Sequence, residues 1–273
     1  MKTTLLSLPL LALAAFLSGC GDAEPASTTT RETLLDSVNN LANVLFSGAD
    51  EEIINALAPD GHTTVSCNVF LLRDAAAGKN ILIDTGMGGE LMAKLEAAGI
   101  APADITDILI THSHDDHVGG LLAADGITPA FPEAIIHITR VELDFWHASS
   151  ADTAAACEEA YIFSYITPDG ETPVALPNLK ALDAPGHTPG HVVFVLDGRH
   201  LFAGDLLHSD LLQFACPEIC ASFDADKPAA IASRVKILSL AADEKWTFQS
   251  CHVMASGKIN KLGDGFSLKQ TKK

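Results

Sequence analysis

Short apolar runs, separated by glycine, aspartate and asparagine, recur along the chain from residue 65 onward. Their length and their β-branched residues predict strands, at 65–72, 80–84, 105–110, 134–139, 192–196, 200–203 and 246–251. The polar loop 73–79 predicts a hairpin between the first two strands. The pair Asp197-Gly198 predicts a tight hairpin turn between two later ones.

Other stretches have the periodicity of helices. A helix over 88–99 would place Leu91, Leu95 and Ala98 on one face, and a second helix is expected to begin with 142–147. A third, over 227–241, would be capped by Asp226. Its predicted apolar stripe consists of Ile231, Val235 and Leu238. The pattern is therefore that of a mixed α/β fold, a class in which sites form where strands end.

The N-terminus reads as a targeting segment. Lys2 precedes an apolar run over 5–17 that is too short to span a bilayer, which is typical of a signal peptide. The run ends in Leu-Ser-Gly-Cys20, which resembles a bacterial lipobox. We therefore expect a lipoprotein signal peptide over 1–19, a lipidated Cys20 with a flexible tether over 20–30, and one domain over 31–273. The protein would be exported and anchored by lipid to a bacterial membrane, facing the periplasm; an ordinary secretory signal is the alternative.

Composition narrows the candidate partners. The formal net charge is −18 at pH 7, and such an acidic surface repels phosphate backbones, which argues against nucleic-acid binding.

None of the six cysteines forms a CxxC pair, so a cysteine zinc site is not expected. Cys67 and Cys251 lie in apolar stretches and are expected to be buried free thiols. The disulfide state of Cys216 and Cys220 stays open, because export permits disulfides.

The strongest chemical signal is the run HSHDDH at 112–117, directly after a predicted strand. Three histidines and an aspartate in one short loop would pack poorly as core. Imidazole nitrogens and carboxylate oxygens are, however, the ligands that zinc takes in catalytic sites. Three later signals also follow predicted strands or flank turns: GHTPGH with His187, AGD with Asp205, and SCH with His252.

Together with Asp84 in ILIDTG, these segments resemble the five ordered motifs of the metallo-β-lactamase superfamily, over most of the chain from residue 65. The resemblance implies an αββα sandwich, with two mixed sheets face to face and helices on the outer faces. It also implies a site with two zinc ions. The first would be bound by His112, His114 and His187. The second would be bound by Asp116, His117 and His252. Asp205 would bridge both, and Asp84 would orient a ligand histidine from the second shell.

In this family, the pair of metals shares a hydroxide that attacks an ester-like bond. Asp205 as the bridge and Asp116 as the proton donor to the leaving group are therefore the candidate catalytic residues. Ligand type alone leaves iron or manganese open as alternatives to zinc. His208, three residues after Asp205, is a candidate to face the site and contact a metal ligand without binding the metal itself. The remaining histidines, His191 among them, are expected to be structural or on the surface.

The segments GDLLHSDLLQF and ELDFW resemble the branch of methyl parathion hydrolase and acyl-homoserine lactonases. There a Trp and a Phe line an apolar pocket, which makes Trp146 and Phe214 pocket candidates; plain core packing is the alternative. A neutral hydrophobic lactone, aryl ester or phosphotriester is the expected substrate. The oligomeric state stays open, with a homodimer among the alternatives.

Other functions fit this sequence less well. Glyoxalase II proteins carry a C-terminal helical domain, for which residues 253–273 are too few. Nuclease branches carry an inserted domain and a basic surface. True β-lactamases lack an aspartate at the position of Asp205. A catalytically silent metal-binding lipoprotein is a further alternative, against which the complete ligand set argues.

Overall fold

The computed structural model describes residues 29–169, 176 and 178–271. The predicted signal peptide, Cys20 and the tether up to residue 28 lie outside the described residues. The first strand begins at Thr30, so regular structure starts at the last residue of the predicted tether, one residue before the predicted start of the domain.

One mixed sheet is formed mainly by the N-terminal half, in the strand order β1-β3-β4-β5-β6-β7. The strands are β1 (Thr30–Ala42), β3 (His62–Asp74), β4 (Lys79–Ile83), β5 (Asp107–Leu109), β6 (Ile135–Thr139) and β7 (Ile162–Ile166). The predicted hairpin joins β3 to β4, and β4 to β7 run parallel. The carboxyl ends of β4 and β5 therefore lie side by side, and the loops that follow them carry Asp84 and the HSHDDH run.

The second sheet has the order β14-β13-β12-β10-β9-β8. Its strands are β8 (Leu179–Asp183), β9 (Val192–Leu196), β10 (His200–Phe202), β12 (Thr247–Gln249), β13 (Gly257–Leu262) and β14 (Gly265–Gln270). Asp197 and Gly198 both have positive φ angles, 57° and 58°, so the predicted tight turn joins β9 to β10. A small third sheet pairs β2 (Phe46–Ser47) with β11 (Cys220–Ala221).

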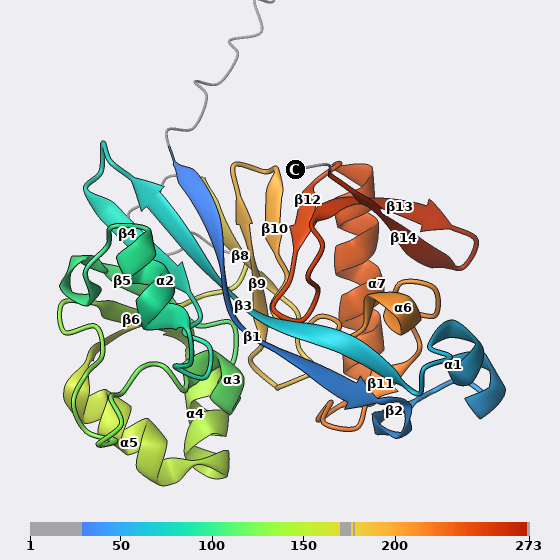
Figure 1. Ribbon diagram of the computed structural model, residues 1–273, viewed down its shortest axis with the longest axis horizontal. Coiled ribbons are helices and arrows are strands. Elements are labelled where there is room, and N and C mark those ends of the chain that lie inside the picture. Colours follow the sequence, from blue (N-terminus) through green and yellow to red (C-terminus); the bar gives the residue numbers. More distant parts are fainter. Residues whose placement is uncertain (1–28, 170–175, 177, 272–273) are drawn as a thin grey trace, which may run out of the picture.

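Helices cover the outer faces of the two large sheets (Figure 1). The α-helices are α1 (Glu51–Leu57), α2 (Leu91–Ala97), α3 (Asp115–Val118), α4 (Arg140–Ser149), α5 (Ala151–Ala160), α6 (Asp210–Gln213) and α7 (Lys227–Asp243). Helices α2, α4 and α5 pack on the first sheet, and α7 packs on the second. A third apolar layer lies between the sheets, where the rings of Phe70 and Phe202 are 5.1 Å apart. The predicted αββα sandwich is confirmed.

The buried face of α7 differs from the predicted stripe. Leu238 is buried as predicted, but Val235 is 41% exposed, and Ala230, Arg234 and Ile237 are buried instead. The reason is Arg234, whose guanidinium donates hydrogen bonds to the carbonyl oxygens of Leu206, Pro217 and Ile219. A charged side chain with this many acceptors can be buried at little cost, so Arg234 lies on the buried face and the neighbouring Val235 lies outside it.

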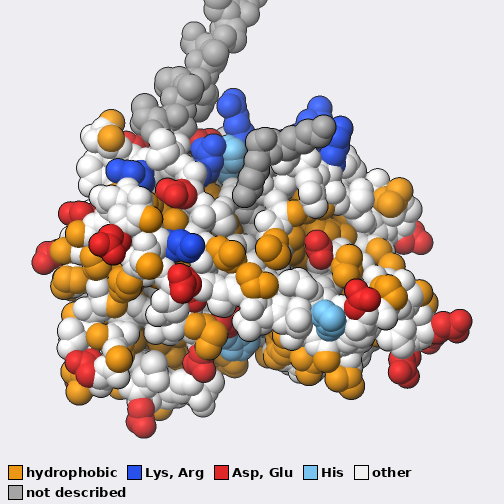
Figure 2. Space-filling model, in the orientation of Figure 1, with side chains coloured by type: hydrophobic (Ala, Val, Ile, Leu, Met, Phe, Trp, Pro, Cys, Tyr) orange, Lys and Arg blue, Asp and Glu red, His pale blue; other side chains and the backbone are white. Residues whose placement is uncertain are grey.

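The surface agrees with the acidic composition. Acidic side chains are spread around the outline of the face shown in Figure 2, whereas Lys and Arg side chains lie mostly in its upper half. Within the described part of the chain, none of the helices is long and apolar enough to cross a bilayer.

Candidate metal centre

The HSHDDH loop is held in place by Asp84, which follows β4 with a positive φ of 61°. One carboxylate oxygen of Asp84 accepts a hydrogen bond from the Thr111 backbone N–H, and the other accepts one from the Thr111 hydroxyl, both at 2.8 Å. The second oxygen also lies 2.8 Å from Nδ1 of His117. Asp84 thus fixes the His117 ring with Nε2 pointing into the site.

His112, His114 and His187 form what we call the first cluster. His112 Nε2 lies 3.1 Å from His114 Nδ1 and 3.1 Å from His187 Nε2, and the last two atoms are 2.8 Å apart. Three converging imidazole nitrogens have too few protons to satisfy one another if the rings are neutral. Their spacing is close to that of ligands around one tetrahedral cation with bonds of roughly 2.0–2.1 Å. The first cluster therefore fits a metal ion.

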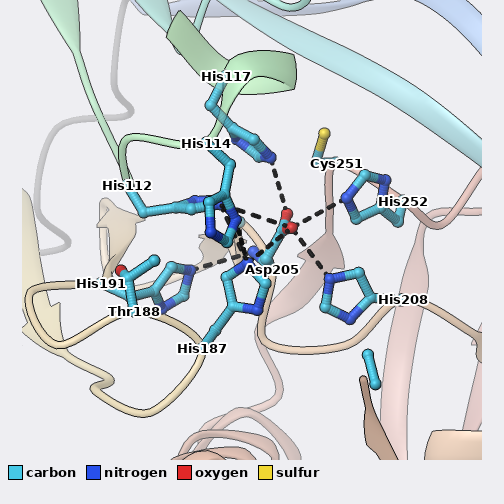
Figure 3. Close-up of polar contacts among 12 residues, drawn as sticks. His112, His114, His117, His187, Thr188, His191, Asp205, His208, Cys251 and His252 are labelled. Atoms are coloured by element: carbon cyan, nitrogen blue, oxygen red, sulfur yellow. Dashed lines mark hydrogen bonds and ion pairs between the residues drawn. The ribbon is translucent and has the colours of Figure 1, made fainter. Parts of the chain in front are cut away.

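Asp116, His117 and His252 form the second cluster. Figure 3 shows His117 and His252 around Asp205, apart from the rings of the first cluster. Asp205 Oδ1 lies 3.0 Å from His117 Nε2, and Oδ2 lies 2.9 Å from His252 Nε2. Asp116 Oδ2 is 3.4 Å from His252 Nε2. His117 Nε2 and Asp205 Oδ1 are both buried, and although they lie 3.0 Å apart, their geometry is not that of a hydrogen bond and neither has a hydrogen-bond partner among the described residues. Buried polar atoms without a partner are costly, and a cation between them would remove that cost.

Asp205 lies between the two clusters, since Oδ2 is also 3.3 Å from His187 Nε2 and 3.6 Å from His112 Nε2. Burial alone would raise the pKa of Asp205, but the surrounding imidazoles, His117 first, hold it well below its usual range. Asp205 is therefore a carboxylate in position to contact a cation on either side. The structure brings together all seven residues that the sequence analysis predicted as metal ligands: His112, His114, Asp116, His117, His187, Asp205 and His252.

The two clusters differ in their protonation. Burial lowers the pKa of His112 well below its ordinary value and that of His187 to about 4, so these two rings of the first cluster are neutral at pH 7. Burial also disfavours the charged form of His252, but Asp205 and Asp116 outweigh it and raise the pKa of that ring to about 9. The second cluster thus holds excess negative charge that positive charge must balance.

Two buried carboxylates that the sequence analysis did not single out hold the first cluster. Asp224 Oδ1 lies 2.9 Å from Nδ1 of His187. Glu142, wholly buried on α4, accepts hydrogen bonds from the Ser113 backbone and hydroxyl with one oxygen. Its other oxygen accepts from the Thr188 hydroxyl and the Gly190 backbone. Glu142 therefore joins the HSHDDH loop to the GHTPGH loop.

Two further histidines lie beside the centre. His191 is buried, as expected of a structural residue: its Nδ1 is 3.0 Å from the Ala184 carbonyl, and its Nε2 accepts the Asp205 backbone N–H. The same nitrogen would be 2.7 Å from a Cβ at Gly204, so a side chain there would clash. His208 Nε2 lies 3.1 Å from Asp205 Oδ2, and the ring faces a cavity. His208 therefore lies beside Asp205, the residue that the sequence analysis predicted as the bridge.

A cavity of about 510 Å³ opens on the centre and is lined by residues of both clusters, His114 of the first and Asp116 and His252 of the second. Asp205 and His208 also line it, and its apolar side chains include Leu41, Val65, Met87 and Phe223. The predicted pocket aromatics lie elsewhere. Trp146 is fully buried beneath α4 in the core of the first sheet, and Phe214 packs on Phe248 in the core of the second. Both fill space between a helix and a sheet, which leaves Phe223 as the aromatic ring at the cavity.

Comparison with known proteins agrees with this centre. The family model described as the metallo-beta-lactamase superfamily matches residues 62–244. A hydroxyacylglutathione hydrolase of Rhodopseudomonas palustris (strain HaA2) is 31% identical over 177 residues, which cover 64% of this chain and 59% of that protein. A second, from Fuscovulum blasticum, is 32% identical over 139 residues, covering 50% of this chain and 47% of that protein. The chain thus spans less than two thirds of the length of these relatives.

Among solved structures, the dizinc quorum-quenching lactonase AidC, in complex with a product, is similar with a TM-score of 0.80 and 26% identity. The similarity covers 89% of this chain and 95% of that one. The hydrolase AbOPH shares the fold with a TM-score of 0.78 at 24% identity, over 90% of this chain and 96% of that one. These neighbours are named as hydrolases, and the matched range contains six of the seven predicted ligands, all but His252. The chain belongs to the metallo-beta-lactamase superfamily.

Proposed function

We propose that this protein is a dinuclear, zinc-dependent hydrolase that cleaves an ester-like bond in a small, neutral, hydrophobic molecule: a lactone, an aryl ester or a phosphotriester. The composition of the cavity wall supports a neutral, hydrophobic substrate. Leu41, Val65, Met87 and Phe223 offer an apolar surface, and none of the residues described at this cavity is lysine or arginine. A site for an anionic substrate would need cationic side chains to offset desolvation of its charge.

The residues of the centre then have distinct roles. When bound, two divalent cations supply Lewis acidity and lower the pKa of a water molecule toward neutrality. The first cluster would hold one cation and the second cluster the other, with Asp205 between them. The side chain of Asp116 is 30% exposed and lines the cavity, so its carboxyl group can pass a proton to the leaving oxygen of the substrate. His208, fixed by Asp205, can steady the substrate from the same side.

The similarity to AidC, named as a dizinc lactonase, supports the lactone as the first substrate to test. A second candidate is hydrolysis of a glutathione thioester, because the curated relatives are named hydroxyacylglutathione hydrolases. The two differ in charge, since glutathione carries carboxylates that this cavity wall does not complement.

A substrate panel on metal-assayed protein tests the proposal. The panel contains an N-acyl-homoserine lactone, a paraoxon-type triester, a hydroxyacylglutathione thioester and nitrocefin, with zinc, iron and manganese measured by elemental analysis. We expect two zinc ions per chain and turnover of the lactone or the triester, lost with a chelator and restored by zinc. Turnover of nitrocefin alone would contradict the proposal, and bound metal without any turnover would indicate a silent binding protein.

We further propose that the protein is exported and anchored to the membrane through a lipid on Cys20. The support is the sequence of the signal segment alone. Metabolic labelling of the full-length chain with a radioactive fatty acid should label the wild type and not Cys20→Ser. Label retained in Cys20→Ser would refute the anchor.

A further inference from the structure

Two buried thiols lie next to the second cluster and have no role in the proposed reaction. Cys67, on β3, and Cys251, directly before His252, are 3% and 1% exposed. Their sulfur atoms are 4.0 Å apart, and both are free thiols in this structure. Neither belongs to the ligand set that the superfamily resemblance implied.

The backbone already holds the two cysteines as neighbours. The Asn68 N–H donates to the Cys251 carbonyl at 3.0 Å, and the Ser66 N–H donates to the His252 carbonyl at 3.2 Å. A disulfide would need the sulfur atoms to approach to about 2.05 Å. Because the flanking chains are hydrogen-bonded to each other, small side-chain and loop movements can supply that approach.

The pair also contacts the second cluster. The Cys67 thiol donates to the Asp116 carbonyl at 3.3 Å. The Cys251 sulfur lies within 4.8 Å of the ligand atoms of Asp116, His117 and His252. Cys67 lines the cavity, which gives a small oxidant a route to its sulfur. A covalent change at this pair would therefore alter the positions of residues in the second cluster rather than those in the first.

We propose that Cys67 and Cys251 are a covalent modification site: a dithiol that oxidises to a disulfide in the folded protein and thereby weakens cation binding at the second cluster. With hydrogen peroxide as the oxidant, the Cys67 sulfur attacks one peroxide oxygen, the O–O bond breaks, and a sulfenic acid and water form. The Cys251 sulfur then displaces that hydroxyl as a second water, and the S–S bond forms. Two thiols and one peroxide give one disulfide and two waters.

The disulfide removes the hydrogen bond from Cys67 to the Asp116 carbonyl and draws Cys251 toward β3. His252 is the next residue, so its ring shifts relative to Asp205. Loss of supporting contacts around ligands typically lowers metal affinity by about 10–100-fold. We expect an effect of that size on one of two bound cations.

Peptide mapping on the metal-loaded full chain tests the covalent step. After treatment with peroxide and alkylation of the remaining thiols, we expect one peptide pair joining Cys67 to Cys251, two hydrogens lighter than the separate peptides. Cys157→Ser, which removes another buried thiol, should form the same pair. Cys67→Ser and Cys67→Ala should not, and their thermal unfolding should resemble that of the reduced wild type. Oxidation that stops at a sulfinic acid, or joins other cysteines, would overturn the proposal.

Chelator competition tests the consequence. The oxidised wild type should release the cation of the second cluster at a chelator concentration at least about 10-fold lower than the reduced protein does. The other cation should leave at an unchanged chelator concentration. Peroxide-treated Cys67→Ser should behave like its untreated form. A disulfide-bonded protein that keeps both cations equally well would refute the link to the second cluster. Since both readouts are independent of substrate, their failure is distinguishable from failure of the proposed hydrolysis.

Discussion

The first and second clusters sit on opposite sides of one carboxylate, yet they are supported in different ways. Rings of the first cluster are held by buried side-chain carboxylates, Asp224 behind His187 and Glu142 behind both loops. In the second cluster, the buried carboxylate of Asp84 holds His117, but His252 is held by the chain itself: its Nδ1 lies 2.9 Å from the Ser66 carbonyl, and the Asn68 amide donates to the loop around it. Two residues of the second cluster, Asp116 and His252, line the cavity, whereas His114 alone does so from the first.

From this difference we expect the first cluster to retain its cation and the second cluster to hold the cation that a substrate reaches. In the first cluster, His112 and His187 are buried, and buried carboxylates hold His187 and the two loops from outside the centre, which suits a cation that stays in place. The second cluster contains Asp116, which is partly exposed, and lies where a substrate would enter. We therefore expect the second cation to be released first under chelation, and substitutions behind each cluster to act on that cluster's cation.

Asp205→Asn should have the largest effect, because it removes the group shared by both clusters. The amide has one oxygen and one NH₂ group, which cannot serve as a ligand, so at most one side keeps its contact. We expect kcat/KM to fall by more than roughly 10²-fold, which exceeds the loss usually seen when a residue that only supports a metal ligand is replaced. Elemental analysis should show less than two metals per chain. Full metal content with unchanged turnover would show that Asp205 does not bridge.

Glu142→Gln should come next and should act on the first cluster. The amide places two donors against the Ser113, Thr188 or Gly190 groups that now donate to Glu142, so the two loops lose their common acceptor. Affinity for the cation at the first cluster should fall by about 10–100-fold in chelator titration. The matched control is Glu158→Gln on α5, whose carboxylate is exposed and bonds only His147 among the described contacts. Equal titration curves for both variants would contradict the role of Glu142.

Asn68→Ala should give the mirror-image result with a smaller magnitude. Its amide donates to the carbonyls of Ser250 and Val253 at 3.0 and 3.2 Å, on either side of His252. Without it the loop loosens, and we expect the second cation to be released at a several-fold to roughly 10-fold lower chelator concentration. Asn80→Ala, which removes a bond to the Asp104 carbonyl far from the site, is the control. Selective loss of the first cation instead would reverse the comparison.

The ligand positions could be predicted from the sequence because they follow strands. Strands β4 and β5 are buried and nearly unbroken in their apolar character, so their carboxyl ends could be located within a few residues. Once those ends were known, Asp84 and the 112–117 loop had to lie together. The tight turn at Asp197-Gly198 was equally readable, since both residues tolerate positive φ.

The sequence could not predict which polar side chains are buried, because that burial depends on partners far along the chain. Nothing local marks Glu142 as fully buried; its four donors come from segments around 113 and 188–190. Arg234 was hidden for the same reason, and it shifted the buried face of α7. Strand β1 was not predicted because most of its residues are exposed, so it lacks a clear apolar alternation. Trp146 and Phe214 were assigned to the pocket by resemblance, but aromatic rings are as well suited to core packing.

Asp107→Asn should have the smallest effect and should leave both clusters equally unchanged. Asp107 is buried at the start of β5, with His137 Nε2 at 2.9 Å and Lys79 Nζ at 2.7 Å. Burial alone would raise its pKa, but the hydrogen bonds from His137, Lys79 and Thr106 outweigh it and lower the pKa to about 2. A carboxyl group with a lowered pKa stabilises the fold above its unfolded pKa of about 3.9, and that contribution is lost as the pH falls through about 2.

The substitution should therefore lower the free energy of unfolding at pH 7 by about 1 kcal/mol, a value reduced for screening by solvent. The gap between wild type and variant should close between about pH 4 and pH 2, as measured by urea unfolding of the metal-free proteins. Asp243→Asn, which breaks the exposed pair with Lys261, should change little at any pH. A gap that persists at pH 2 would mean that shape rather than charge matters at Asp107. A change in the order of cation release would mean that the sheet, and not only the residues behind each cluster, sets the difference between them.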